Sequence, residues 1–147
     1  MTNRRLTSHL ILAIALLAGI WGAQASAETP KAAAAPPAAM PAGFKRVELQ
    51  RHDIAQANHE AVQARGEFEA GAAVPRHSHP GEEVGFVLAG ELTVEVDGKP
   101  AQTVKAGEVF FIPAGTVHAG KNTSKGQTVV ISTYIVEKGK PLSTPAK

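Results

Sequence analysis

The sequence contains no cysteine among its 147 residues. No disulfide can therefore cross-link the fold, and no thiolate is available to a metal ion, so any metal site must use histidine and carboxylate ligands. The chain also lacks a run of basic residues, although Lys and Arg outnumber Asp and Glu by 15 to 13. Without a clustered basic face, it does not fit a nucleic-acid-binding protein.

The N-terminal region has the layout of a secretory signal peptide. Arg4 and Arg5 precede an apolar run over residues 10–20, and Ala25-Ser26-Ala27 is typical of a cleavage site. A membrane anchor is the alternative, but the run is shorter than the roughly 20 apolar residues that span a bilayer. We therefore predict a signal peptide over residues 1–27 that is cleaved after Ala27. The mature protein would be periplasmic or secreted, with no membrane association.

Removal of that segment changes the charge balance. It takes away two of the 15 basic residues and none of the 13 acidic ones, which leaves a formally neutral chain with 13 of each. The next segment, residues 28–43, is rich in Ala and Pro and has too few large apolar side chains to offset the entropy of ordering it. We predict a flexible linker there, a single domain over residues 44–140 and a flexible tail over residues 141–147.

After the linker, the sequence has no long stretch of helical periodicity and consists of short β-branched runs separated by Gly, Pro and Asp-Gly. Residues 62–68 alternate between apolar and polar side chains, which predicts a strand with one apolar face. Residues 92–104 predict a hairpin with a type I′ turn at Asp97-Gly98. Residues 109–112 and 127–136 complete the set, the latter as a central or wrapping strand. The pattern predicts an all-β fold, either a closed barrel or a double-sheet jelly roll.

One group of residues has the composition of a metal site. His77 and His79 are two positions apart, so on an extended strand both imidazoles point to the same face. A turn follows at Pro80-Gly81, and Glu83 on the next strand can return beside them. His118 arrives from another part of the sheet after a Pro/Gly turn. Imidazole and carboxylate ligands suit one divalent transition metal, and Fe, Mn, Ni, Zn, Co and Cu all accept them.

These residues belong to two spaced patterns. Gly71, His77, His79, Glu83 and Gly90 follow the spacing Gly-x5-His-x-His-x(3 or 4)-Glu-x6-Gly, and Gly107, Pro113, Gly115, His118 and Asn122 follow Gly-x5-Pro-x-Gly-x2-His-x3-Asn. The two patterns resemble the two motifs of the cupin superfamily. The resemblance implies a jelly-roll β-barrel, also called a double-stranded β-helix, with three histidines and one glutamate as metal ligands and with a homodimer as the assembly. It implies that Asn122 stabilises a loop.

Strand parity extends this interpretation to the surroundings of the metal. Glu82 is as acidic as Glu83, but neighbouring strand residues face opposite sides, so we predict that Glu83 points inward and Glu82 faces solvent. Phe86, Phe110 and Phe111 are interpreted as core residues that could also wall a pocket. No arginine or lysine clamp is expected there, which favours a small neutral or aromatic ligand over a strongly anionic one.

Two functions are compatible with this site. The first is a metal-dependent enzyme similar to the quercetin-dioxygenase-like cupins, since a three-His, one-Glu set leaves coordination positions open. The second is a metal-containing module that binds a small molecule without converting it. The observation that supports the second function is the lack of an evident general acid or base near the metal. Tyr134 is the one phenol in the sequence, but the sequence does not show whether it faces the metal.

Overall fold

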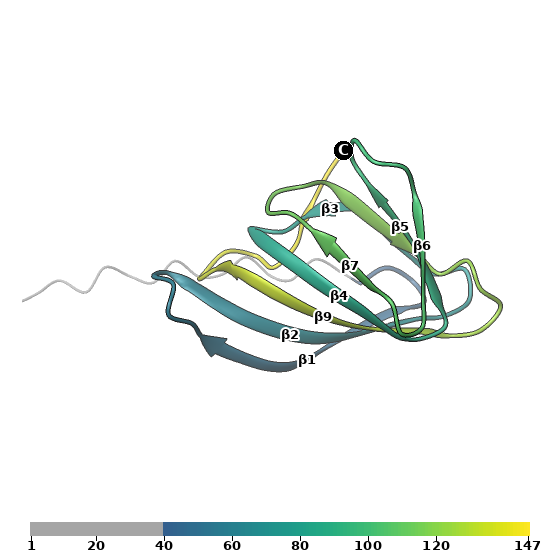
Figure 1. Cartoon of the computed structure of the whole chain (residues 1–147), viewed down its shortest axis with the longest axis horizontal. Coiled ribbons are helices and arrows are strands. Elements are labelled where there is room, and N and C mark those ends of the chain that lie inside the picture. Colours follow the sequence, from purple (N-terminus) through teal and green to yellow (C-terminus); the bar gives the residue numbers. More distant parts are fainter. Residues whose placement is uncertain (1–39) are drawn as a thin grey trace, which may run out of the picture. The chain divides into compact units, whose positions relative to one another are not determined.

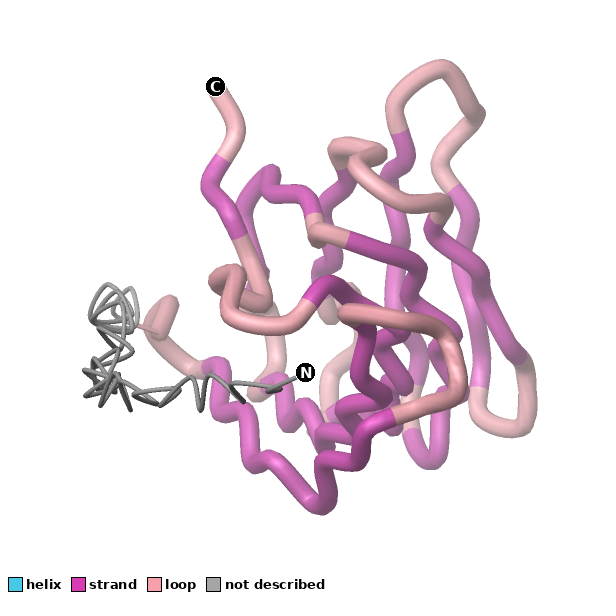
Figure 2. The backbone as a smooth tube through the Cα atoms, turned by 90° about the vertical axis from the view of Figure 1, so that its left-hand side faces the viewer, coloured by secondary structure: helices cyan, strands magenta, loops and turns pink. Residues whose placement is uncertain are grey.

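The computed structural model describes residues 40–147, which form strands and loops (Figure 2). Within this range there is no helix, and so none with the length and hydropathy needed to cross a bilayer. The predicted signal peptide and most of the predicted linker lie outside the described residues. The ten strands are β1 (Phe44–Asp53), β2 (His59–Phe68), β3 (Ala73–Ser78), β4 (Gly81–Ala89), β5 (Glu91–Val96), β6 (Gln102–Lys105), β7 (Val109–Ile112), β8 (His118–Lys121), β9 (Thr128–Glu137) and β10 (Thr144–Pro145).

The strands form two five-stranded antiparallel sheets. One has the order β1-β2-β9-β4-β7 and the other the order β10-β3-β8-β5-β6. Figure 1 shows β1, β2, β9 and β4 side by side, with β5 and β6 in the second sheet. After β2, consecutive strands alternate between the sheets except at the β5–β6 hairpin, so the chain winds back and forth as a double-stranded β-helix. The prediction of an all-β jelly roll is confirmed, and β9 lies between β2 and β4 as a central strand.

The alternation in β2 decides which face of its sheet is buried. Val62 is fully buried, Ala64 and Phe68 are nearly so, and the residues between them are partly exposed. Pairing with β9 continues this buried face, since Val62 lies opposite Tyr134 and Ala64 opposite Ser132. The predicted apolar face of residues 62–68 is therefore confirmed, and it faces the space between the sheets.

The hairpin between β5 and β6 forms as predicted, but its turn is of another type. The amide of Lys99 donates to the Val96 carbonyl at 3.0 Å, which places Asp97 and Gly98 at the centre of the turn. A type I′ turn needs positive φ at both central residues, and only Gly98 has it, at 76°. This combination corresponds to a type II turn. Asp97 is held instead by an ion pair with Arg76 at 2.7 Å and by its own amide, which donates to Val117.

The outer side of β4 and β7 differs from the sequence prediction. Phe86 and Phe111, interpreted as core residues, are 39% and 53% exposed. On β4 the buried positions are instead Gly81, Glu83, Gly85 and Val87. Gly85 leaves space for the ring of Phe110, since a Cβ there would lie 2.0 Å from that ring. The exposed residues form one apolar face on adjacent strands, which consists of Val84, Phe86, Leu88, Val109 and Phe111.

The C-terminal segment also differs from expectation, because residues 141–147 do not simply extend from the domain as a tail. Thr144 and Pro145 pair with Ser78 and His77 of β3, and the amide of Ala146 donates to the Arg76 carbonyl at 3.0 Å. Leu142 packs against a buried cluster that includes Val62 and Tyr134. The apolar side chain and these backbone hydrogen bonds hold the segment against the fold.

Asn122 stabilises the loop between β8 and β9, as the motif implied. Its side chain is fully buried, and its Nδ2 donates to the carbonyls of Phe68, Glu69 and Gly126 at 3.1, 3.0 and 2.7 Å. Its Oδ1 accepts from the amide and hydroxyl of Ser124. One side chain thus joins the end of β2 to the loop that precedes β9.

Candidate metal centre

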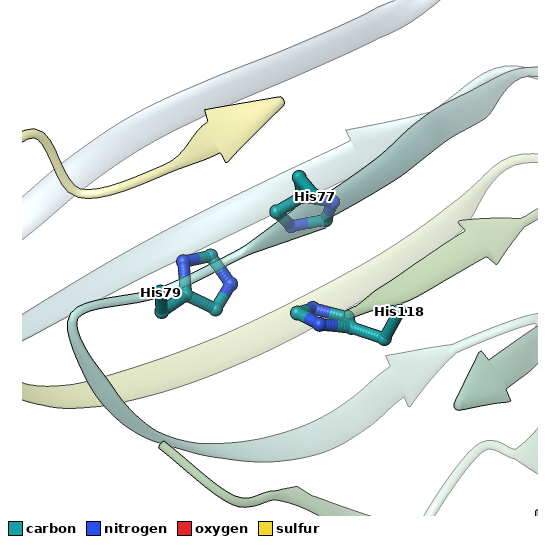
Figure 3. A group of neighbouring side chains, drawn as sticks. All are labelled: His77, His79 and His118. Carbon is teal, nitrogen blue, oxygen red and sulfur yellow. The ribbon is translucent and has the colours of Figure 1, made fainter. Parts of the chain in front are cut away.

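The three motif histidines meet at one end of the space between the sheets. His77 lies on β3 and His118 begins β8, and the two are direct cross-strand partners with ring centroids 4.2 Å apart. His79 follows the end of β3, with its ring centroid 4.8 Å from that of His77 and 5.0 Å from that of His118. Figure 3 shows the three rings pointing toward one another. Their ligand nitrogens lie within 4.8 Å of one another, so the group could hold a metal ion.

Glu83 reaches this group from the other sheet. It lies on β4 and is 5% exposed, and its Oε2 is 3.1 Å from Nε2 of His79 and 3.3 Å from Nε2 of His118. Glu82 lies on the opposite side of the strand and is partly exposed. The structure therefore brings together all four residues that the sequence analysis selected, and it places the two neighbouring carboxylates on opposite faces.

The other nitrogen of each imidazole is fixed by a backbone carbonyl. Nδ1 of His77 lies 2.9 Å from the Pro75 carbonyl, and Nδ1 of His118 lies 3.0 Å from the Thr116 carbonyl. Nδ1 of His79 lies 2.6 Å from the carbonyl of Leu142, in the C-terminal segment. A carbonyl only accepts, so each Nδ1 donates to its carbonyl, and each ring turns Nε2 toward the centre.

Burial and the neighbouring charges favour the forms that bind metals. Burial, assisted by the positive charge that His118 can carry, lowers the pKa of His77 to about 4, so this ring is neutral at pH 7. Burial alone would raise the pKa of Glu83, but hydrogen bonds with His118 and His79 outweigh it and hold this pKa well below its ordinary value. Nε2 of His79 and of His118 therefore meets an oxygen of an ionised carboxylate. Such a set of nitrogen and oxygen ligands fits a divalent cation.

Tyr134 is a neighbour of this centre whose position the sequence analysis left open. Its ring packs edge-on against His79 with centroids 4.7 Å apart, and the residue is 7% exposed. Burial, together with the negative charge of Glu83, raises the pKa of its phenol, which therefore stays protonated. The alternation of β9 was the available signal, because Ser132, Tyr134 and Val136 share its buried face.

A cavity of about 520 Å³ adjoins the centre, and His77, Glu83 and His118 form part of its wall. Most of the remaining wall is apolar, as expected. However, Arg46 and Arg76 also line it, whereas the sequence analysis expected no cationic side chain there. Arg46 was missed because β1 shows no clear alternation. The apolar residues of the wall include Phe44, Phe68, Leu92, Val94, Phe110 and Val130.

Comparison with known families identifies this arrangement. Residues 64–137, which contain every candidate ligand, match the family Cupin_2, described as "Cupin domain". The chain belongs to the cupin superfamily. The match covers the strands β3 to β9 and the second half of β2, and thus strands of both sheets of the jelly roll. The fold and family implied by the two sequence motifs are confirmed.

Similar cupins include plant proteins. The chain is 40% identical over 76 residues to a germin-like protein, subfamily 2 member 2, of Arabidopsis thaliana, which covers 48% of this chain and 35% of that protein. It is 33% identical over 78 residues to oxalate oxidase 1 of Hordeum vulgare, which covers 48% of this chain and 39% of that protein. The matched part is therefore well under half of these relatives' length.

A solved structure agrees with these matches. A recombinant oxalate oxidase in complex with glycolate superposes with a TM-score of 0.58 at 28% identity, over 72% of this chain and 56% of that one. The likeness extends across most of the described fold. These comparisons show a cupin with a histidine group that could bind a metal ion.

Proposed function

We propose that this protein is a metal-dependent cupin enzyme that converts a small organic molecule in the cavity between the sheets. The observation that carries the proposal is the position of His77, His118 and Glu83 in the wall of that cavity. A ligand in the cavity would therefore lie against the metal centre. The name of the similar oxalate oxidases denotes oxidation of a small organic molecule, which supports redox chemistry for this site as well.

The residues at this centre would have different roles. His77, His79, His118 and Glu83 would hold one divalent ion, which when bound supplies a Lewis acid or an oxygen-activating centre. The carbonyls of Pro75, Thr116 and Leu142 orient the rings, and the apolar wall excludes water and packs against the body of the ligand. The protonated phenol of Tyr134 packs against His79 and limits its movement.

The adjacent carboxylates Glu82 and Glu83 provide a matched test of this proposal. Wild-type protein, Glu83→Gln and Glu82→Gln would be loaded separately with Fe, Mn, Co, Ni, Cu and Zn, and incubated with phenols, diketones and small carboxylic acids. Oxygen uptake and product formation would be followed. We expect turnover by the wild-type protein and by Glu82→Gln, and its loss in Glu83→Gln. Failure of every metal and substrate to turn over would refute the enzyme proposal.

A second function, a metal-containing binding module without turnover, is supported by the composition of the cavity wall. Besides the candidate ligands, the ionisable groups in that wall are Arg46, Arg76 and Tyr134, and none of them exchanges a proton readily near pH 7. Mass spectrometry of the bound molecule separates the two functions. A binding module would release its ligand unchanged after long incubation with metal and oxygen.

We further propose that the protein is exported, with cleavage after Ala27. The arginine pair, the apolar run and the Ala-x-Ala pattern of the N-terminal segment support this. Intact-mass measurement of protein from the exported fraction should give a chain that begins at Glu28. A chain in that fraction that retains residues 1–27 would contradict the cleavage site.

We also propose a homodimer in which the apolar face defined above packs against its copy. This face suits a symmetric contact, because apolar side chains are compatible with themselves and Val84 and Phe86 lie directly opposite Phe111 and Val109. Light scattering coupled to gel filtration should give twice the chain mass for the wild-type protein and a single chain for Phe111→Glu. Leu49→Glu, at an exposed apolar residue on β1, is the matched control and should remain dimeric.

A further inference from the structure

Arg46 is a charged residue of the cavity wall to which the proposed function gives no role. It lies on β1 directly opposite Gly66 of β2, and Gly66 lies opposite Val130 of β9. Cross-strand partners share a face, and Val130 is buried between the sheets, so the side chain of Arg46 is on the inner face. It lines the same cavity as His77, Glu83 and His118.

Arg46 differs from the other arginines of the described residues in its partners. Arg51 pairs with Glu48 and Glu60, Arg65 pairs with Glu67 at 3.3 Å, and Arg76 pairs with Asp97 at 2.7 Å. Within residues 40–147, no carboxylate forms an ion pair with Arg46, and its side chain donates no hydrogen bond to the protein. Its guanidinium therefore has all of its donors available to the solvent or to a ligand.

Inward-facing residues lead from Arg46 to the candidate metal centre. Arg46 is aligned across the sheet with Val130 of β9. Ser132 and Tyr134 follow on the same buried face of β9, and both line the cavity. Tyr134 packs against His79, so the guanidinium and the candidate metal centre belong to one inner surface.

The rest of the wall limits what the cation could bind. A cavity of about 520 Å³ is large enough for a small organic molecule. Its wall is mostly apolar and includes five phenylalanine or leucine side chains, Phe44, Phe68, Leu92, Phe110 and Leu142. One unpaired cation in an apolar cavity favours a ligand with one acidic group on an apolar body. This revises the sequence-based expectation of a neutral ligand.

We propose that Arg46 binds the carboxylate of a small organic monoacid, and that the apolar body of this acid lies along the cavity wall toward the histidines. The proposal rests on the proposed function, because it names the substrate class of the same cavity. A guanidinium donates two parallel hydrogen bonds to a carboxylate, which fixes the orientation of the acid as well as its position. The end of the molecule remote from the carboxylate would then face the metal centre.

The test compares acids with amides of the same shape. The dissociation constants of benzoate, benzamide, hexanoate and hexanamide would be measured by calorimetry for metal-free and zinc-loaded full-length protein. The variants are Arg46→Gln, Arg46→Lys and Arg65→Gln. Arg65→Gln is a matched control, because Arg65 lies on β2, does not line the cavity, and its replacement changes the charge equally.

We expect the wild-type protein to bind the acid at least about tenfold more tightly than the amide, with or without zinc. Arg46→Gln should abolish this preference and Arg46→Lys should restore part of it, whereas Arg65→Gln should keep it. Equal binding of acid and amide, an unchanged preference in Arg46→Gln, or no binding of either acid at millimolar concentration would overturn the proposal.

Zinc stoichiometry measured on the same samples separates this proposal from the proposed function. A preference for acids that depends on Arg46 in a protein that binds no zinc would refute the metal centre and support the carboxylate site. Stoichiometric zinc with equal binding of acid and amide would refute the carboxylate site alone.

Discussion

Two buried polar clusters of this molecule differ in the kind of partners that they contain. Around Asn122, the partners are backbone groups and a hydroxyl, because its amide nitrogen faces three carbonyls and its oxygen accepts from Ser124. Around Glu83, ionisable groups converge, because Nε2 of His79 and of His118 lies 3.1 and 3.3 Å from the carboxylate while each Nδ1 faces a backbone carbonyl. The first cluster is satisfied by neutral groups and stabilises the fold, whereas the second presents nitrogen and oxygen ligands to a cation.

The largest effect on stability is expected at the self-sufficient cluster. Asn122→Ala would leave several buried carbonyls and the Ser124 amide without partners, which should lower the free energy of unfolding by about 3–5 kcal/mol. Urea denaturation of metal-free protein measures this change. Thr123→Ala, at the exposed neighbouring position, should cost less than about 1 kcal/mol. If both variants lost a similar free energy of unfolding, the structural role assigned to Asn122 would be contradicted.

In the cluster around Glu83, a substitution is expected to reduce metal affinity strongly and stability only slightly. His118→Ala should weaken zinc binding at least about 100-fold, equivalent to ~2.7 kcal/mol, and destabilise the metal-free protein less than Asn122→Ala does. Competition with a chromogenic chelator measures the affinity. His52→Ala, at an exposed histidine on β1, should leave the affinity unchanged. Undiminished stoichiometric binding by His118→Ala would show that the centre does not hold the metal.

A smaller effect is expected from the C-terminal segment. Deletion of residues 141–147 removes the Leu142 carbonyl that orients His79, and should weaken zinc binding about tenfold. Deletion of residues 146–147 alone keeps this carbonyl and should preserve the affinity. If both truncated chains bound zinc equally, the hydrogen bond from His79 would have no role in metal binding.

The smallest effect concerns pH. The pKa of His77 is about 4 in the folded state and about 6.5 when the chain is unfolded. The unfolded state therefore binds more protons between these values, so the free energy of unfolding of the metal-free protein should rise as the pH increases from 4 to 6.5. Because His77 is partly exposed, we expect a rise of about 1 kcal/mol. Chemical denaturation across this window measures it, and His77→Gln should show a shallower dependence.

The fold and the proximity of the four candidate ligands could be predicted from the sequence because both depend on local spacing. The strand period places His77 and His79 on one face, and the turns that follow bring Glu83 and His118 to them. Interactions between distant segments were not predictable in this way. The carbonyl of Leu142 lies 63 residues from His79, and no local pattern relates the two.

Hydrophobicity was a poor guide on β4, where both faces of the strand are unusual. On β4 the inner face holds Glu83, Gly85 and Val87, while the outer face holds Val84, Phe86 and Leu88, so the more apolar face points to solvent. Hydrophobicity alone therefore assigned Phe86 to the wrong side. The inner face of this strand is set by the candidate ligand Glu83 and by Phe110, which occupies the space above Gly85.

The candidate ligands belong to two sheets, since Glu83 lies in one and the histidines lie in or beside the other. A bound ion would therefore cross-link the two sheets of a protein that has no cysteine to form a disulfide between them. Unlike a disulfide, such a metal cross-link is broken by a chelator or by acid and forms again when the ion is restored. The rigidity of the whole jelly roll would then depend on how much metal its compartment supplies.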